Sequence, residues 1–445
     1  MSKADRVRIR RQAMKAVGIS RRQRGNYGQH NLRQYPVYEI AWANEIPAHP
    51  SSKGFELMRI EYGVDILDLS GLITIHVGRT AAQILASDRA LLARLLQCKQ
   101  QWSYLSYLPS RYGYSDCLDD ATRCVAAKMR QIVLTTDQLP DATVLSHYGK
   151  ALKSLQAAVN DPVSCLKSDI LCATEILALF ELLSFSSGDK WKHHMAGAAQ
   201  LIKLRGPQNY STNFDQALFM ALAGLILTEA IMNNERCFLE RDEWQEVLRS
   251  MIVPGDTLAD RSPIVISLWS CAVYGAGLFK DVTSAIFGYE TYSHTRIENL
   301  IRGGLHARER FLQWRRDFDA LPESTGQNHY NKRYQVLGVF HSCLALTNRL
   351  IGAIDSSRRT DLEFESQALA SEVARMESEA ASTSPVASFF LSQKMKIAQS
   401  ILDTATTWND NEDEPRDHRP HENLIEKWKF GHWCLALGRV TCCTN

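Results

Sequence analysis

Apolar residues recur three and four positions apart along most of the chain, which is the spacing of a helix with one buried face. In the segment 164–188, residues such as Ile170, Leu177 and Phe180 follow this spacing before a Ser-Ser-Gly stop signal. Ser87-Asp88 interrupts another such segment and offers a cap for a new helix. The same pattern predicts helices at 80–102, 189–205, 213–235, 262–279, 294–318, 329–354, 361–381, 385–408 and 421–438.

Short turns separate these predicted helices, and strand patterns are few. The turns are rich in Pro, Gly, Asn and Asp, which end helices, and no repeat of fixed length is visible. Helix after helix with short connections predicts an all-α fold, a large stack or bundle of antiparallel helical hairpins. The most apolar window, 217–232, is too short to span a bilayer comfortably and contains Glu229. We therefore predict a buried helix there and no association with a membrane.

Charge divides a chain whose composition is otherwise ordinary for a globular protein. Hydrophobic residues make up 45% and charged residues 22% of it, which argues against a disordered or fibrous protein. Through Arg33 there are two lysines and eight arginines but a single acid, Asp5. This leader has a charge of +9 and the remainder −7, because the whole chain has +2. We predict a basic N-terminal arm at 1–34 and a helical domain at 35–445.

The cysteines give no sign of a disulfide framework or a zinc site. There are eleven, an odd number, and they are scattered without a C-x-x-C pair. The first residues, MSKADRVRIRRQ, lack the apolar run of a secretory signal. These features favour a reducing intracellular compartment.

Signatures of common enzymes and cofactor sites are missing from the sequence. It has no G-x-G-x-x-G, no Gly-rich loop ending in Lys-Ser or Lys-Thr, no H-E-x-x-H and no G-x-S-x-G. Asp116, Asp119 and Asp120 form a carboxylate cluster of a kind that can hold Mg²⁺ for diphosphate ionisation. No second acidic motif that could bind the same metal follows downstream. We therefore favour the interpretation that these aspartates interact with the positive N-terminal end of a helix. We predict no enzymatic activity, no cofactor and no metal site.

The segment 189–206, DKWKHHMAGAAQLIKLRG, places two adjacent histidines beside a tryptophan. Gly206 can take the left-handed conformation after a helix, and Pro207 prevents the helix from continuing. No carboxylate or serine partner for His194 is apparent at helical spacing. We therefore interpret His194 as a hydrogen-bonded packing residue rather than a base or a metal ligand. One face of the predicted helix holds Trp191, His194, Ala198, Leu201 and Ile202.

These residues also carry a family resemblance. The pattern Trp191-x-x-His194-x-x-Gly197-Ala198-x-x-Leu201-Ile202-x-x-Arg205-Gly206 is similar to the signature of the fungal-specific transcription factor domain, a helical regulatory region that accompanies zinc-cluster DNA-binding modules. The terminal Trp433-x-x-Ala436-Leu437-Gly438-Arg439 resembles the end of that domain. The resemblance covers residues 1–440 and is strongest at 160–206. It implies structural roles for Trp191, His194, Gly197, Ala198, Leu201, Arg205 and Gly206.

The arginine-rich leader is similar to the basic leader of family members without a zinc cluster. Full regulators of this class open with cysteines around two zinc ions, whereas the first cysteine here is Cys98, so direct zinc-dependent base readout is not supported. The arm has three alternative roles: an import signal, a contact with DNA phosphates without base readout, or pairing with the acidic body. The residues expected to contact nucleic acid or an import receptor are Arg6, Arg8, Arg10, Arg11, Arg21, Arg22 and Arg24.

The resemblance implies a nuclear protein that regulates expression of a pathway, with secondary metabolism as one option. It would act through a protein partner or homodimer, a small-molecule effector or weak DNA contacts. An alternative from another class is a helical enzyme or small-molecule-binding protein that uses a pocket within the same fold. A third hypothesis is a scaffold that dimerises with a separate DNA-binding protein.

Overall fold

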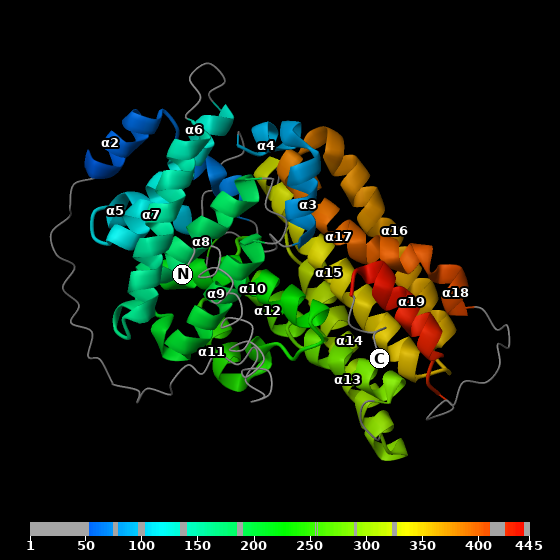
Figure 1. Ribbon diagram of the computed structural model, residues 1–445. Coiled ribbons are helices and arrows are strands. Elements are labelled where there is room, and N and C mark those ends of the chain that lie inside the picture. Colours follow the sequence, from blue (N-terminus) through cyan, green and yellow to red (C-terminus); the bar gives the residue numbers. More distant parts are fainter. Residues whose placement is uncertain are drawn as a thin grey trace, which may run out of the picture. The chain divides into compact units, whose positions relative to one another are not determined.

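The computed structural model describes residues 53–73, 79–96, 103–133, 140–184, 190–253, 255, 257–288, 292–322, 327–409 and 423–439. Every regular element in these ranges is a helix, which confirms the predicted all-α class (Figure 1). The basic arm lies outside the described residues, so its boundary at residue 34 stays a prediction.

Short helices that begin at polar caps form the first described part of the chain. Asp65 Oδ1 accepts a hydrogen bond from the backbone N–H of Leu67 at 3.0 Å, and Asp88 Oδ1 accepts one from Leu91 at 3.0 Å. The second cap confirms the predicted break at Ser87-Asp88. The elements are α2 (Lys53–Tyr62), η1 (Ile66–Leu72), α3 (Arg79–Ser87), α4 (Arg89–Leu95), η2 (Tyr104–Tyr107) and α5 (Leu108–Arg111).

The next helices pack side by side around α8. Helix α6 contacts both α7 and α8, and α8 contacts α9. Every residue of α8 from Asp169 to Leu183 is buried, which explains why its sequence is apolar on all sides. The elements are α6 (Asp116–Val133), α7 (Asp141–Asn160), η3 (Ser164–Leu166), α8 (Ser168–Leu183), α9 (Lys190–Arg205) and η4 (Pro207–Asn209).

One long predicted helix, 262–279, is two helices in the structure. Helix α12 ends at Ala272 and α13 begins at Gly275. A Cβ atom at Gly277 would lie 2.6 Å from Glu240 Oε2, so this glycine allows α13 to approach η5. Helical periodicity continues across the turn, and for that reason the sequence did not show it. The elements are α10 (Asn213–Met232), η5 (Phe238–Glu240), α11 (Asp242–Ser250), α12 (Pro263–Ala272) and α13 (Gly275–Phe287).

Long helices fill the C-terminal part of the chain, where α15 packs against α14, α16 and α17. The predicted helix 385–408 is divided at Thr404, whose hydroxyl accepts a hydrogen bond from Arg349 Nη1 at 2.6 Å. Arg349 is fully buried and forms a two-pronged ion pair with Glu363, at 2.8 and 2.6 Å. The elements are α14 (His294–Asp319), α15 (Gln327–Ile354), α16 (Arg359–Thr383), α17 (Pro385–Asp403), α18 (Ala405–Asn409) and α19 (Lys427–Leu437).

In the part of the chain that the structure describes, three segments are long and apolar enough to cross a membrane by length and composition. They are Asn213–Met232, Pro263–Phe287 and Tyr330–Ile354, and 72%, 50% and 89% of their apolar windows are buried within the protein. Helix α10 has 20 residues and ends three residues before the predicted end at 235, but its apolar part is longer than the window 217–232 suggested. Its predicted burial is confirmed, because other helices of the same chain cover most of its apolar surface.

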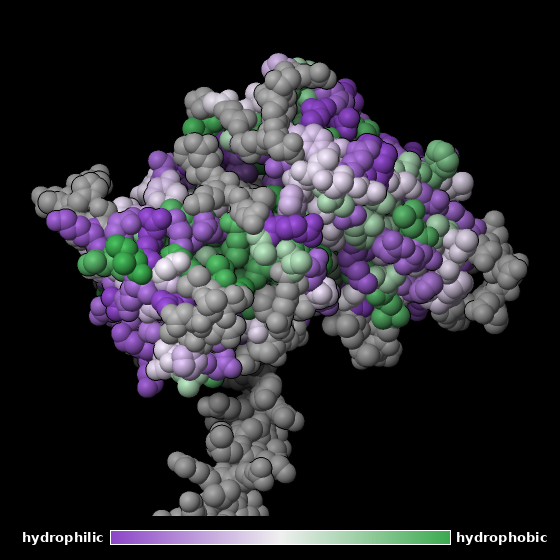
Figure 2. All heavy atoms as spheres, turned by 90° about the horizontal axis from the view of Figure 1, so that it is seen from above, coloured by the Kyte–Doolittle hydropathy of each residue, from purple (hydrophilic) through white to green (hydrophobic). Residues whose placement is uncertain are grey.

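The face that α19 buries differs in part from the expected one. The spacing within 421–438 predicts that Leu424, Trp428 and the pair Cys434-Leu435 pack inward. Leu424 and Cys434 are buried, but the exposed fractions of Trp428 and Leu435 are 44% and 51%. Phe430 and Trp433 are fully buried instead, and Trp433 packs in the aromatic cluster with Phe279 and Trp408. The helix is apolar nearly all round, so periodicity alone did not choose its inner face. On the face seen in Figure 2, the coloured surface is mainly hydrophilic with local apolar areas.

Candidate functional site

The residues of the family motif lie on α9, and most of them are buried against α8. Trp191 is 4% exposed, Leu201 7%, and Ala198 and Ile202 are fully buried. At Gly197 an added Cβ would lie 4.0 Å from Thr174 Cγ2 of α8. The motif therefore provides a packing surface, and Gly197 leaves enough room for an alanine.

His194 belongs to a hydrogen-bonded chain, in which Tyr148 links it to Glu181, that the sequence did not reveal. Tyr148 of α7 lies with its hydroxyl 3.2 Å from His194 Nε2 and donates a hydrogen bond to Glu181 of α8. The ring of Tyr148 stacks on Phe180, with 4.5 Å between the ring centroids. Burial lowers the pKa of His194, while the charge of Glu181 opposes that shift. The partners come from two other helices, so spacing within α9 gave no sign of them.

Arg205 joins three helix ends. Its Nη2 donates to Asp215 Oδ1 at 2.6 Å, to Ser168 Oγ at 3.2 Å and to the backbone carbonyl of Asn209 at 3.2 Å. These contacts connect the end of α9 with the starts of α8 and α10. Arg205 is 3% exposed, and its pairing with Asp215 compensates the buried charge. This arrangement holds the helices together through Nη2, while the buried Nε and Nη1 have no hydrogen-bond partner among the described residues.

The chain turns at Gly206 directly after this arginine. Gly206 has φ 72° and ψ 163°, so φ is positive as expected but ψ lies outside the left-handed helical region. A Cβ atom there would lie 2.7 Å from Gln208 Oε1. Pro207 then begins η4, so the helix ends where the sequence predicted.

The carboxylates at the start of α6 are used within the protein. Asp119 accepts hydrogen bonds from the backbone N–H of Gly113 at 2.9 and 3.1 Å, and Asp120 forms an ion pair with Lys150 at 2.8 Å. Within the described residues no group of three or more His, Cys, Asp or Glu is placed to hold a metal ion. The geometry thus agrees with the interpretation of these acids as local partners near a helix start.

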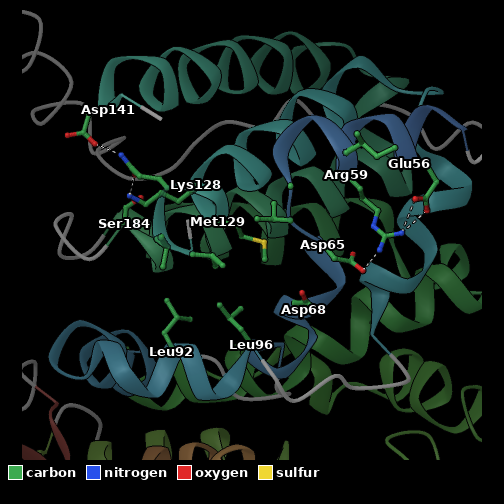
Figure 3. A pocket seen from close by; sticks show the side chains of 17 residues that line it. Glu56, Arg59, Asp65, Asp68, Leu92, Leu96, Lys128, Met129, Asp141 and Ser184 are labelled. Carbon is green, nitrogen blue, oxygen red and sulfur yellow. Dashed lines mark hydrogen bonds and ion pairs between the residues drawn. The ribbon is translucent and has the colours of Figure 1, made fainter. Parts of the chain in front are cut away.

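A large hollow lies between α4 and α6, with α2 and η1 at one end (Figure 3). It has a volume of about 1180 Å³. Leu92 and Leu96 point into it from α4, opposite Met129. Its charged groups are engaged with neighbours: Arg59 pairs with Glu56 at 2.7 Å and with Asp65 at 2.9 Å. The hollow is wide, its lining is polar and apolar in similar measure, and it offers no assembled set of catalytic groups among the residues described.

A second hollow of about 390 Å³ is bordered by η2, the start of α10 and the segment before α12. It adjoins a smaller one of about 40 Å³, and Ile73, Tyr104 and Ala221 line both. Sequence patterns gave no sign of either hollow, since their walls come from segments more than a hundred residues apart.

Other residues singled out from the sequence have different outcomes. The cysteines in the described ranges are free, and most are buried. The arginines expected to contact nucleic acid or an import receptor lie outside the described residues: Arg6, Arg8, Arg10, Arg11, Arg21, Arg22 and Arg24.

Comparison with known families adds to this geometry. A family model described as "Fungal specific transcription factor domain" matches residues 115–442. The chain belongs to this family. The match confirms the resemblance carried by α9 and α19 and includes the helices from α6 onward, but it does not include residues 1–114, which the resemblance was expected to cover. It begins after the basic leader, so that leader is outside the matched transcription factor domain.

A curated relative of this transcription factor domain protein comes from Emericella nidulans. It is described as "Uncharacterized protein AN5342" and is 32% identical over 145 residues. That alignment covers 32% of this chain and 31% of the relative, so it spans about a third of the relative's length. No solved structure gives a significant match to the chain.

Proposed function

We propose that this protein is a nuclear regulator of gene expression. The observation that carries the proposal is the family match over residues 115–442, because it includes both helices on which the motif residues lie. The helical domain would contact a protein partner or a second copy of the chain. A role in secondary metabolism belongs to the same proposal.

The basic arm supplies the second part of the proposal. Its charge of +9 through Arg33 suits an import receptor or the phosphate backbone of DNA. Arginines that neutralise phosphates do not read bases, so contacts made by the arm would be weakly sequence-specific. Recognition of particular genes would then come from a partner of the helical domain.

Localisation of the tagged full chain tests the import role. The test variant replaces Arg8, Arg10, Arg11, Arg21, Arg22 and Arg24 by glutamine, and the matched control replaces them by lysine. We expect the glutamine variant to lose nuclear accumulation and the lysine variant to keep it, since receptors and phosphates both respond to charge. A wild-type protein that regulates its genes while excluded from the nucleus would refute the proposal.

Genome occupancy separates the DNA contact from import. Both the full chain and a variant without its first 33 residues would carry the same added import signal, so that both reach the nucleus. We expect occupancy to fall but its positions to stay the same in the shortened protein, because the arm adds affinity without specificity. Equal occupancy of the two proteins would remove the DNA-contact role and leave import.

A further inference from the structure

The hollow of about 390 Å³ has the size and lining of a small-molecule site. Ligand pockets in proteins usually enclose roughly 300–1,000 Å³ and are mainly apolar with a few convergent polar groups. Here Tyr107, Met220 and Val253 supply apolar walls, while Asn213 and Arg261 supply polar groups. The hollow therefore has mainly apolar walls and one polar edge.

Arg261 gives this polar edge a positive charge without a carboxylate partner among the described residues. Its Nε donates to the carbonyl of Met251 at 2.8 Å, its Nη1 to Asn213 Oδ1 at 3.0 Å, and its Nη2 to Gln216 Oε1. All three acceptors are neutral, so they hold the guanidinium in place but do not compensate its charge. A partly buried cation of this kind favours an anionic group beside it.

The start of α10 lies at the same edge and adds to the positive potential. Asn213 is the first residue of this 20-residue helix and lines the hollow. The N-terminus of a helix carries a partial positive charge of roughly half an elementary charge. Asp215 in the first turn is paired with Arg205 at 2.6 Å, and Asp260, which also lines the hollow, has an interaction of its own. The edge thus suits one small anionic group.

The adjoining smaller hollow fixes the orientation that a ligand would take. Glu175 lines it, and no described residue hydrogen-bonds to its buried Oε1. A ligand carboxylate would be disfavoured in this smaller hollow, which is mainly apolar and has no cation among its described lining residues, and favoured beside Arg261. The apolar part of the molecule would then point toward Ile73, Tyr104 and Ala221, which line both hollows.

We propose that this hollow binds a mainly apolar small molecule with one carboxylate, held at Arg261 and Asn213, with its apolar body between η2 and α10. The inference does not depend on the proposed nuclear role, because it concerns binding to the isolated full-length protein.

Calorimetric titration of the purified full chain tests the inference with three probes of equal chain length: decanoate, 1-decanol and decylamine. We expect decanoate to bind with one-to-one stoichiometry and at least about tenfold more tightly than 1-decanol, since a tenfold preference corresponds to about 1.4 kcal/mol. Decylamine should bind most weakly because of Arg261. Equal affinities for decanoate and 1-decanol, or no saturable binding of decanoate, would overturn the proposal.

Variants then locate the site. Arg261→Gln should abolish the preference for decanoate over 1-decanol. Arg261→Lys keeps the positive charge and should retain most of that preference.

Ala217→Phe fills the hollow without removing a hydrogen bond of Arg261 and should weaken binding of both probes at least about tenfold. Arg249→Gln, on an exposed side chain of α11, is the surface control and should change neither affinity. Helical circular dichroism establishes that each variant is folded, and undiminished decanoate binding by folded Ala217→Phe would exclude this hollow as the site.

Discussion

At the scale of single residues, this protein accommodates buried charges in two different ways. Arg349 and Glu363 have fully buried side chains and satisfy each other through two hydrogen bonds. Glu175 is 3% exposed, and no residue in the described part of the chain hydrogen-bonds to its Oε1. A buried carboxyl without a partner is held in its neutral form. The two cases therefore respond differently to pH.

Burial raises the pKa of Glu175 well above its usual range, and the charge of Arg205 only partly opposes this shift. The unfolded chain ionises this carboxyl near its usual pKa of about 4.3, whereas the folded protein keeps its proton to higher pH. The stability that Glu175 contributes is therefore complete below the pKa of the unfolded state. It is lost as the pH rises through the higher pKa of the folded state.

Replacing Glu175 by glutamine tests this linkage. Glutamine has nearly the same shape but cannot ionise, so Glu175→Gln should remove one source of the decline in stability between pH 5 and pH 8. We expect its free energy of unfolding, measured in urea, to exceed that of the wild type by more at pH 8 than at pH 5. The exposed Glu246→Gln is the control and should change stability by less than about 0.5 kcal/mol at either pH. An identical pH dependence in Glu175→Gln and the wild type would contradict the raised pKa.

At the scale of the element, helix ends are set by local chemistry and then tied by distant partners. The end of α9 combines both, since Gly206 turns the chain with φ 72° and Arg205 bonds to Asp215 of α10. Helix α14 offers a contrast, because Gly303 lies within it and has no atom within 4 Å of an added Cβ. The positive φ of Gly206 requires a glycine, whereas the helical conformation of Gly303 does not.

Alanine at these two glycines should act in opposite directions. Gly206→Ala forces a Cβ into a positive-φ conformation and toward Gln208, so we expect a loss of about 1–2 kcal/mol in the free energy of unfolding. Gly303→Ala should stabilise α14 by up to about 1 kcal/mol, because alanine is the better helix former. Urea unfolding midpoints, with unchanged slopes, measure both effects. A neutral Gly206→Ala would mean that the turn relaxes to another conformation.

At the scale of the whole molecule, charge is distributed very unevenly along the chain. The leader carries +9 and the remainder −7, so opposite charges reside in the arm that we predict and the helical domain. If the arm contacts DNA phosphates, binding to duplex DNA must weaken steeply with salt. If the arm instead pairs with the acidic domain, removing its arginines would change DNA binding little.

Salt titration of DNA binding distinguishes these cases. For random-sequence duplex, the slope of log affinity against log salt should be about −0.9 for each phosphate neutralised. Replacing Arg8, Arg10, Arg11, Arg21, Arg22 and Arg24 by glutamine should make that slope less steep by up to about 5, and replacing them by lysine should preserve it. Fluorescence anisotropy across a range of salt concentrations measures the slopes. Identical slopes for the glutamine variant and the wild type would exclude phosphate contact by these arginines.

Much of the helical architecture was predictable because its signals are local. Caps and periodicity predicted the break at Ser87-Asp88, the end of α9 at Gly206 and most of the long C-terminal helices. They missed the turn between α12 and α13, because the apolar spacing continues across it. They were also wrong about part of the inner face of α19, where Trp428 is exposed and Phe430 is buried.

The sequence by itself determined the all-α class, the family motif on α9 and the contrast in charge between leader and domain, since each depends only on which residues follow one another. Tertiary structure alone decided that Tyr148 links His194 to Glu181, and that Arg261 and Met220 border one hollow. Such groups are brought together by packing between helices, whose contacts depend on three-dimensional shape rather than on spacing along the chain.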